Sequence, residues 1–325
     1  MSVRHTADNL AEKLNQAVES WRLTGQVKAC VHDNVRNIVS ANNPTRVSWH
    51  SVPCFAHTLQ LAVNDGFAAY LNRVVAAAGR LVKHFNHSTA ATKALEAKQQ
   101  QMQPPPHRLL QSCKTRWNSV CDMFGRLVEQ RWAVSAVLSD RTVTRLPDAR
   151  ALELRDKYWQ LMEDVAPVLA ALKCATTVMS AETEVSIPNT YPITFSLINT
   201  HLMRVKGDSS KVAEFKSKVR PSLGERMKVE SDDLISTPPM IATKLDPQHK
   251  HLGFLTPTRR IPGNSKLLEL AVAEDVSSTT DEASRTASGD ERGTQAGVAV
   301  QGAALQRRTT PPPAPMTRKK KWTAF

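Results

Sequence analysis

An uninterrupted helical repeat of apolar residues occupies the middle of the chain and constrains the fold more than any other feature. That spacing places the residues on one face of a helix, which has to be buried. Similar series begin at Trp117 and Tyr158, and strong helix formers fill Thr89–Gln103. Residues 57–205 are therefore predicted to form an all-helical block. The repeat consists of Leu71, Val74, Val75, Ala78, Leu81, Val82 and Phe85.

Residues before this block alternate between helical and strand patterns. The stretch from Ala7 to about Arg22 has helical spacing and follows Thr6, a favoured N-cap residue. Three further elements are predicted along the chain, namely a strand at Gln26–His32, a helix at Val35–Ala41 and a strand at His50–Phe55. This order is typical of α/β architecture, so residues 1–56 are predicted to be an α/β segment.

The chain beyond the helical block carries weaker patterns. Residues 206–261 are predicted to be poorly defined. Residues 262–325 are rich in Ser, Thr, Gly, Ala and Glu, and they are predicted to be a disordered tail because they cannot bury enough apolar surface to offset the entropy of ordering. The tail ends in the basic run Arg318, Lys319, Lys320 and Lys321, which suits a nuclear import receptor, although a random basic end explains it equally well.

Charge and cysteine usage limit the classes of function. The net charge of +13 and the pI of about 9.7 favour polyanionic partners, with nucleic acid first among them. Five scattered cysteines without a secretion signal indicate free thiols in a reducing compartment. No apolar run approaches the roughly 18–20 residues of a membrane span. We therefore expect neither a membrane nor a small-molecule substrate as a partner.

Four stretches in order resemble hAT-superfamily transposases and their domesticated relatives, closest to the BED-type zinc finger proteins. The second has the form C-x-x-H-x-L-x-L and the third reads T-R-W-N-S. The resemblance implies an α/β fold class, with a partial ribonuclease-H-like core, a large all-helical insertion and a disordered C-terminal tail. The matching stretches are His5–Asn9 continuing to Cys30–Val39, then Pro53–Val63, Lys114–Ser119 and Ala242–Pro247.

The resemblance implies an active site of two aspartates and a glutamate that hold two divalent metal ions. Asp33 matches the second aspartate, at the end of a predicted strand, whereas the residues alone also allow Asp33 to cap the next helix. No residue matches the first aspartate. The glutamate has no match either, because the candidates Glu269 and Glu274 lie outside the family's pattern. One carboxylate cannot hold a metal pair, so we predict no catalysis, with Mg²⁺ bound only if other segments complete the triad.

Cys54 and His57 are candidate zinc ligands, and Cys30 and His32 are candidate additional donors. A structural zinc needs four ligands, and no second paired motif accompanies these residues. The alternative is that Cys54 and His57 are packed in the interior. The family's zinc-binding BED finger has no counterpart in this sequence, so zinc is a weak expectation here.

Arg116 and Trp117 are the candidate nucleic-acid contacts. In the transposases that the chain resembles, this pair lies near the DNA ends, where an indole can stack on a base and a guanidinium can meet a phosphate. The alternative is that Trp117 begins a helix and packs in the core with Val120 and Phe124.

Three functions are consistent with these observations. The first is a non-catalytic, transposase-derived protein of the nucleus, with DNA and related hAT-type proteins as partners. The second is a DNA transposase completed by missing segments or by a partner chain. The third is a truncated product without a function of its own. We expect the first, because two of the three carboxylates have no match.

Overall fold

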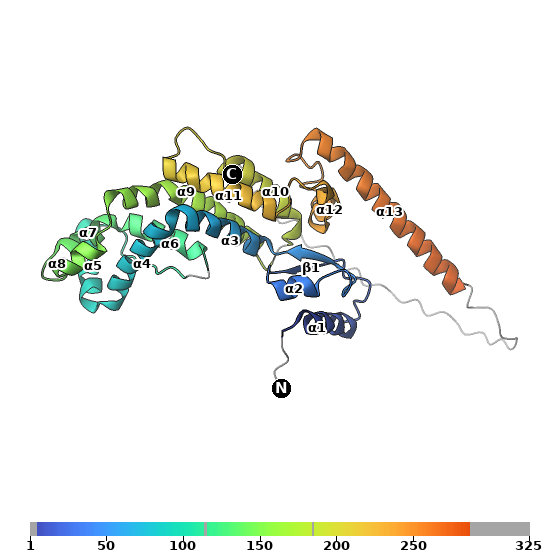
Figure 1. The fold of residues 1–325 in the computed structure, drawn as a ribbon, viewed down its shortest axis with the longest axis horizontal. Coiled ribbons are helices and arrows are strands. Elements are labelled where there is room, and N and C mark those ends of the chain that lie inside the picture. The colour runs from blue at the N-terminus through green and yellow to red at the C-terminus, as the bar shows by residue number, and fades with distance from the viewer. Residues whose placement is uncertain (1–4, 114–115, 184, 287–325) are drawn as a thin grey trace, which may run out of the picture. The chain divides into compact units, whose positions relative to one another are not determined.

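The structure is a computed structural model that describes residues 5–113, 116–183 and 185–286 (Figure 1). The chain divides into two units, residues 1–264 and residues 265–325. Helices predominate, and the first unit also contains a two-stranded sheet. Of the helices within the described ranges, none is both long enough and apolar enough to cross a membrane.

The N-terminal α/β segment has the predicted helix–strand–helix–strand order. Helix α1 (Ala7–Ser20) begins after Thr6, whose hydroxyl accepts a hydrogen bond from the Asn9 amide at 3.3 Å. Strand β1 (Ala29–His32) pairs in parallel with β2 (His50–Pro53), and α2 (Arg36–Ala41) connects them. One parallel strand pair with its crossover helix is consistent with α/β architecture. It does not by itself establish the ribonuclease-H-like core, which stays a prediction.

The block predicted to be helical is helical from α3 onward. Two of its segments, η1 and η3, are π-helices, and Pro167 lies inside α9 without ending it. The elements are α3 (Phe55–Gly66), η1 (Phe67–Leu71), α4 (Asn72–His87), α5 (Thr89–Met102), α6 (Asn118–Glu129), α7 (Arg131–Ser139), α8 (Leu146–Leu152), α9 (Asp156–Met179), the 3₁₀ turn η2 (Ile187–Asn189), α10 (Thr190–Ser196), η3 (Leu197–His201) and α11 (Ser210–Arg226).

These helices share one large hydrophobic core. Helices α3, α9 and α11 contact one another, and α6 packs on α9 (Figure 1). Gly66 allows α3 to approach α11 closely, because a Cβ atom there would lie 2.5 Å from Val219 Cγ2. The largest fully buried side chains include Phe85, Phe124 and Phe215. Each such side chain stabilises the fold by about 1.5–3 kcal/mol relative to an exposed one.

Residues 206–261 are better ordered than the sequence predicted. Helix α11 belongs to the main core, because Phe215, Val219 and Leu223 recur every four residues among its many charged side chains. The turn η4 (Asp232–Ser236) and α12 (Pro238–Leu245) follow. They form a second, smaller core whose buried members are Tyr191, Leu234, Met240, Leu252 and Leu255.

The segment predicted to be disordered from residue 262 begins within a helix. Helix α13 spans Pro257–Thr286, because leucine, alanine and glutamate give residues 265–276 high helix propensity despite the composition of the whole tail. Several of its apolar side chains are exposed, including Leu268 and Val272. Residues 287–325, with the basic run from Arg318 to Lys321, lie outside the described residues.

Candidate functional site

Asp33 directly follows β1, and its side chain is exposed. Its Oδ1 atom accepts a hydrogen bond from the Val35 amide at 3.2 Å, which satisfies a backbone donor at the start of α2. The neighbouring Asn34 donates from Nδ2 to the Thr58 hydroxyl at 3.2 Å and so ties the end of β1 to α3. The carboxylate therefore makes a local turn contact just before α2 and is not the helix cap that the residues alone allowed, because Val35 is the N-cap residue and no side chain caps this helix.

The candidate zinc ligands do not gather into a site. Both ring nitrogens of His32 are engaged, Nδ1 with the Asp33 carbonyl at 2.6 Å and Nε2 with the Ser51 hydroxyl at 2.7 Å. Cys54 and His57 are half-buried at the start of α3. Burial also raises the pKa of the Cys30 thiol, which makes it a poorer source of thiolate. Across the described residues, no three His, Cys, Asp or Glu side chains are placed to share a metal ion.

The acidic candidates of α13 make no such group either. Glu269 forms an ion pair with Lys266 at 2.9 Å on the same helix. The side chain of Glu274 lies outside the described part of the structure. Of the acidic residues considered for the metal pair, Asp33 is therefore the one that matches the family's pattern and whose surroundings are described.

Trp117 is buried in the helical core, with 4% of its surface exposed. It lies just before α6 in the same cluster as Val120 and Phe124. This position corrects the stacking role considered for Trp117, because its covered indole offers no face to a base. Arg116 is exposed, so of this pair only its guanidinium can reach a phosphate.

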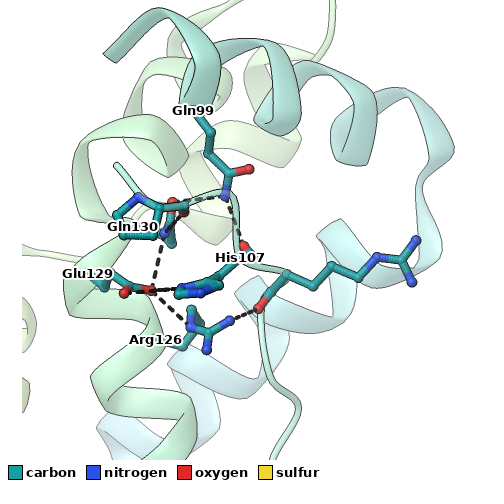
Figure 2. A network of polar contacts seen from close by, with 7 residues as sticks. Gln99, His107, Arg126, Glu129 and Gln130 are labelled. Carbon is teal, nitrogen blue, oxygen red and sulfur yellow. Dashed lines mark hydrogen bonds and ion pairs between the residues drawn. The ribbon is translucent and has the colours of Figure 1, made fainter. Parts of the chain in front are cut away.

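A buried polar network holds the chain that leads toward Arg116 (Figure 2). Gln99 Nε2 donates to the His107 carbonyl at 2.9 Å and to Gln130 Oε1 at 2.8 Å. Gln130 Nε2 donates in turn to the Pro105 carbonyl at 2.8 Å. Both glutamines are at least 97% buried, so these bonds satisfy backbone groups that water cannot reach. Residues 104–107, which include three consecutive prolines, are therefore fixed although they contain no helix or strand.

Glu129 forms the charged edge of this network. Its Oε2 atom lies 3.0 Å from His107 Nδ1 and 3.0 Å from Arg126 Nε. Burial alone would raise the pKa of Glu129, but hydrogen bonds from His107 and Gln130 and the charges of His107 and Arg126 outweigh it. The net pKa is lowered. The carboxylate is thus held ionised beside the fixed segment.

A groove of about 770 Å³ opens where η1 with the start of α4, the start of α9 and the start of α11 meet. Three cations from these three places line it, namely Arg73, Lys157 and Lys211. Asp164 is the acid of the lining, and it accepts a hydrogen bond from Gln160 at 2.8 Å. Positive charge therefore predominates along the groove, which we call the basic groove.

Two tyrosine rings accompany the cations of the basic groove. Lys211 Nζ lies 5.8 Å from the ring centre of Tyr70, and Lys157 Nζ lies 5.8 Å from that of Tyr158. Each distance is within the range of a cation–π contact. Lys211 also pairs with Glu214 at 2.6 Å, whereas the described residues offer no acidic partner to Arg73 or Lys157.

The N-terminus of α11 adds hydrogen-bonding capacity to the basic groove. Ser209 precedes the helix, and its hydroxyl is buried without a hydrogen-bond partner among the described residues. The loop before it is anchored by the buried ion pair between Lys216 and Asp208 at 2.8 Å. A helix N-terminus carries partial positive charge and donor groups that suit an anion.

Sequence reasoning missed the basic groove. The sequence contains two local signs of it, the spacing of Tyr70 and Arg73 by three positions and the adjacent pair Lys157 and Tyr158. Neither sign distinguishes a groove from a solvated helix face, and only the packing of α4, α9 and α11 brings them together. Two other cations, Lys216 and Arg126, form ion pairs with Asp208 and Glu129.

Comparisons with known proteins agree with the resemblance. Residues 52–167 match the family described as the ZBED1 RNase-like helical domain. Zinc finger BED domain-containing protein 6 of Homo sapiens is 26% identical over 252 residues, which are 75% of this chain and 24% of that protein. The Mus musculus protein of the same name is 27% identical over the same shares. Zinc finger BED domain-containing protein 4 of Homo sapiens is 24% identical over 183 residues, 55% of this chain and 15% of that protein. The chain thus spans less than a quarter of the length of each relative.

Proposed function

Because this chain is a relative of the BED-type zinc finger proteins derived from hAT transposases, we propose that it is a non-catalytic scaffold that binds nucleic acid. The basic groove carries this proposal. Cations from three separate elements converge there with two aromatic rings and a helix N-terminus. Cations on a solvated helix face would lie along one helix and would not be brought together from three elements.

The chemistry of the basic groove suits a phosphodiester backbone. Arg73 and Lys157 can neutralise phosphates and release counterions, which is the main source of sequence-independent affinity. Ser209 and the first amides of α11 can donate to a phosphate oxygen. Tyr70 and Tyr158 offer aromatic surface of the kind on which bases stack in grooves for single strands. The proposed ligand is therefore nucleic acid rather than a small anion.

The surroundings of Asp33 support a non-catalytic role. Its carboxylate accepts a hydrogen bond from the Val35 amide, and a metal ion bound to this carboxylate would compete with that bond. A transposase completed by other segments remains the second hypothesis from the resemblance. It predicts nicking of DNA that requires a divalent metal and disappears in an Asp33→Asn variant. We expect no such nicking.

The continuous helical core argues against the hypothesis of a truncated product without a function. Three phenylalanines and many aliphatic side chains of α3–α11 are fully buried. A core of this kind predicts a cooperative thermal transition. A melt that shows helix without cooperativity would support the truncated product instead.

The test of the proposed function compares two triple variants of equal charge. One replaces Arg73, Lys157 and Lys211 of the basic groove with alanine. The control replaces Arg80, Lys83 and Lys93, which are exposed on α4 and α5 outside the groove, with alanine. Anisotropy of a labelled single-stranded oligonucleotide, titrated at several salt concentrations, reports affinity and salt dependence.

We expect the groove variant to lose most of the affinity. Its slope of log affinity against log salt should fall by about 0.7 for each phosphate that the variant no longer neutralises. The control should lose much less on both measures. Equal losses in the two variants would mean that bulk charge alone drives binding, and the groove would then carry no function.

We also propose that the protein acts in the nucleus, directed by the basic run Arg318, Lys319, Lys320 and Lys321. A fluorescent fusion of the full chain should accumulate in nuclei, and replacing the four residues with alanine should abolish this. If the fusion protein with the four alanines still accumulates in nuclei, the basic run does not direct the protein there.

A further inference from the structure

A second groove, of about 1060 Å³, lies between η3, the turn after it and the C-terminal half of α11. Its apolar lining includes Ile198, Leu202 and Val229, each of which also belongs to the main core. Met203 at its edge is 41% exposed. Ile198, Leu202 and Val229 are only 1–8% exposed, so the floor of the groove is the edge of the main core. Met203 is the exposed apolar side chain beside it. We call it the apolar groove.

Gly224 of α11 is one of the lining residues of the apolar groove. A Cβ atom at this position would lie 3.5 Å from Val229 Cγ2 and 3.8 Å from Ile198 Cδ1, which is ordinary van der Waals contact. A side chain longer than alanine would therefore extend into the space between these residues.

The elements around the apolar groove are held in place by polar contacts. Arg220 Nε donates to the Ile198 carbonyl of the π-helix η3 at 3.0 Å. Lys216 Nζ donates to the Met203 carbonyl at 3.2 Å while it pairs with Asp208. Short π-helical segments are frequent at functional sites. The groove is thus a formed feature that does not depend on a partner for its shape.

The rim of the apolar groove is mainly positive. Arg204, Arg220 and Lys228 line it, against two acids, Glu225 and Glu230. Glu230 is already paired with Arg259 at 3.1 Å. Three cations therefore face one acid that has no ion pair within the described part of the chain. An apolar surface with such a rim is complementary to an apolar segment with acidic flanks.

We infer that the apolar groove binds an amphipathic helix of a partner protein, with aliphatic side chains on one face and acidic residues beside them. Helices and a turn line the groove, so no open strand edge is available there to pair with an extended peptide. A helical ridge can insert between η3 and α11 as helices pack elsewhere. Met203 can adapt to the aliphatic side chains of the partner. This surface shares no residue with the basic groove, so the inference is independent of nucleic-acid binding.

The test uses the full chain and two designed peptides. Each is a fluorescein-labelled helix of about 18 residues, long enough for five turns. Leucine occupies one face at helical spacing, and the flanks carry glutamate in one peptide and lysine in the other. Anisotropy gives both affinities at physiological salt. We expect the glutamate peptide to bind at least about 10-fold more tightly than the lysine peptide.

Three variants assign the binding to the apolar groove. Gly224→Phe should abolish binding of both peptides, because its ring fills the space. The double variant Arg204→Glu with Lys228→Glu should reverse the preference between peptides. Arg80→Glu with Lys83→Glu makes the same change of charge outside the groove and should leave the preference intact. Matching thermal melts show that each variant is folded.

The inference is overturned if neither peptide binds or if both bind with equal affinity. It is also overturned if the folded Gly224→Phe variant binds as well as the wild type. If Gly224→Phe does not fold, the double charge variant decides, because its residues are exposed on the rim. A preference unchanged by that double variant would place any peptide binding elsewhere.

Discussion

The helical body and the N-terminal α/β segment are stabilised very differently. The helical body, α3 to α11, buries three phenylalanines completely in one continuous cluster. The α/β segment has two strands of four residues and a small cluster of Ala11, Ala41, Val47 and Trp49. Two-stranded sheets are marginally stable by themselves. We infer from this difference that the helical body contributes most of the free energy of folding. Both grooves also lie in the helical body.

Exposed apolar residues reinforce this comparison. Val31, Val35 and Val39 of the α/β segment are 43–53% exposed. A strand and helix pair with apolar side chains in water has little burial to offset its ordering entropy. The segment gains support from α3 through the contact between Asn34 and Thr58. We therefore expect it to open before the helical body does.

The largest expected effect separates two tryptophans of the helical body. Trp117→Ala should lower the free energy of unfolding by about 3–5 kcal/mol, because it empties a core site. Trp132 is 67% exposed and lies beside the Arg131 guanidinium. Trp132→Ala should therefore change the free energy of unfolding by about 0.5 kcal/mol or less. Urea unfolding measures both. Unchanged stability in Trp117→Ala together with weakened nucleic-acid binding would restore the stacking role.

The next effect tests the close approach of α3 and α11. In Gly66→Ala, the new methyl would lie 2.5 Å from Val219 and 2.6 Å from Phe215, so we expect a loss of about 1–3 kcal/mol from overpacking. Gly125 in α6 is the matched control, since nothing lies within 4 Å of a Cβ atom there. Gly125→Ala should gain about 0.5–1 kcal/mol from helix propensity. A neutral Gly66→Ala would show that the two helices are loosely packed.

The smallest effect concerns pH and the network of Figure 2. The pKa of Glu129 is lowered in the folded state, so its ionised form stabilises the fold above the usual glutamate value of about 4.3. That contribution is lost as the pH falls through the lowered value. The stability difference between wild type and Glu129→Gln should therefore be constant near neutral pH and shrink below about pH 4.

Glu96→Gln, which changes an exposed acid of α5 outside this network, controls for general charge effects. Unfolding free energies of the three proteins at a series of pH values provide the measurement. A difference that grows as the medium becomes acidic would contradict the assigned direction of the Glu129 shift.

Local patterns in the sequence predicted the elements better than they predicted the surfaces. The order of helices and strands followed from spacing, because the face that Leu71 and Phe85 share is a local property. Helix α11 was missed because its charged residues obscure the apolar positions Phe215 and Val219. The composition of the whole tail predicted disorder where α13 lies, although residues 265–276 have a short helix-like pattern.

The site was less predictable than the fold. For Asp33 and Trp117, the sequence offered both a functional and a structural interpretation. The hydrogen bond from the Val35 amide to Asp33 and the burial of the Trp117 indole favour the structural one. The basic groove joins residues near 70, 157 and 210, whose proximity depends on tertiary packing. No spacing along the chain encodes that proximity, so the groove required the structure.

Hydrogen exchange of the full chain, with and without a single-stranded oligonucleotide, tests the central claim most directly. In the free protein, we predict the slowest exchange in α3, α9 and α11 and fast exchange in β1 and α2. Added oligonucleotide should protect the segments 68–74, 157–161 and 209–211, which contain most of the residues that line the basic groove. Protection confined to residues 29–35 and 54–58, at the end of the strand pair, would contradict the account.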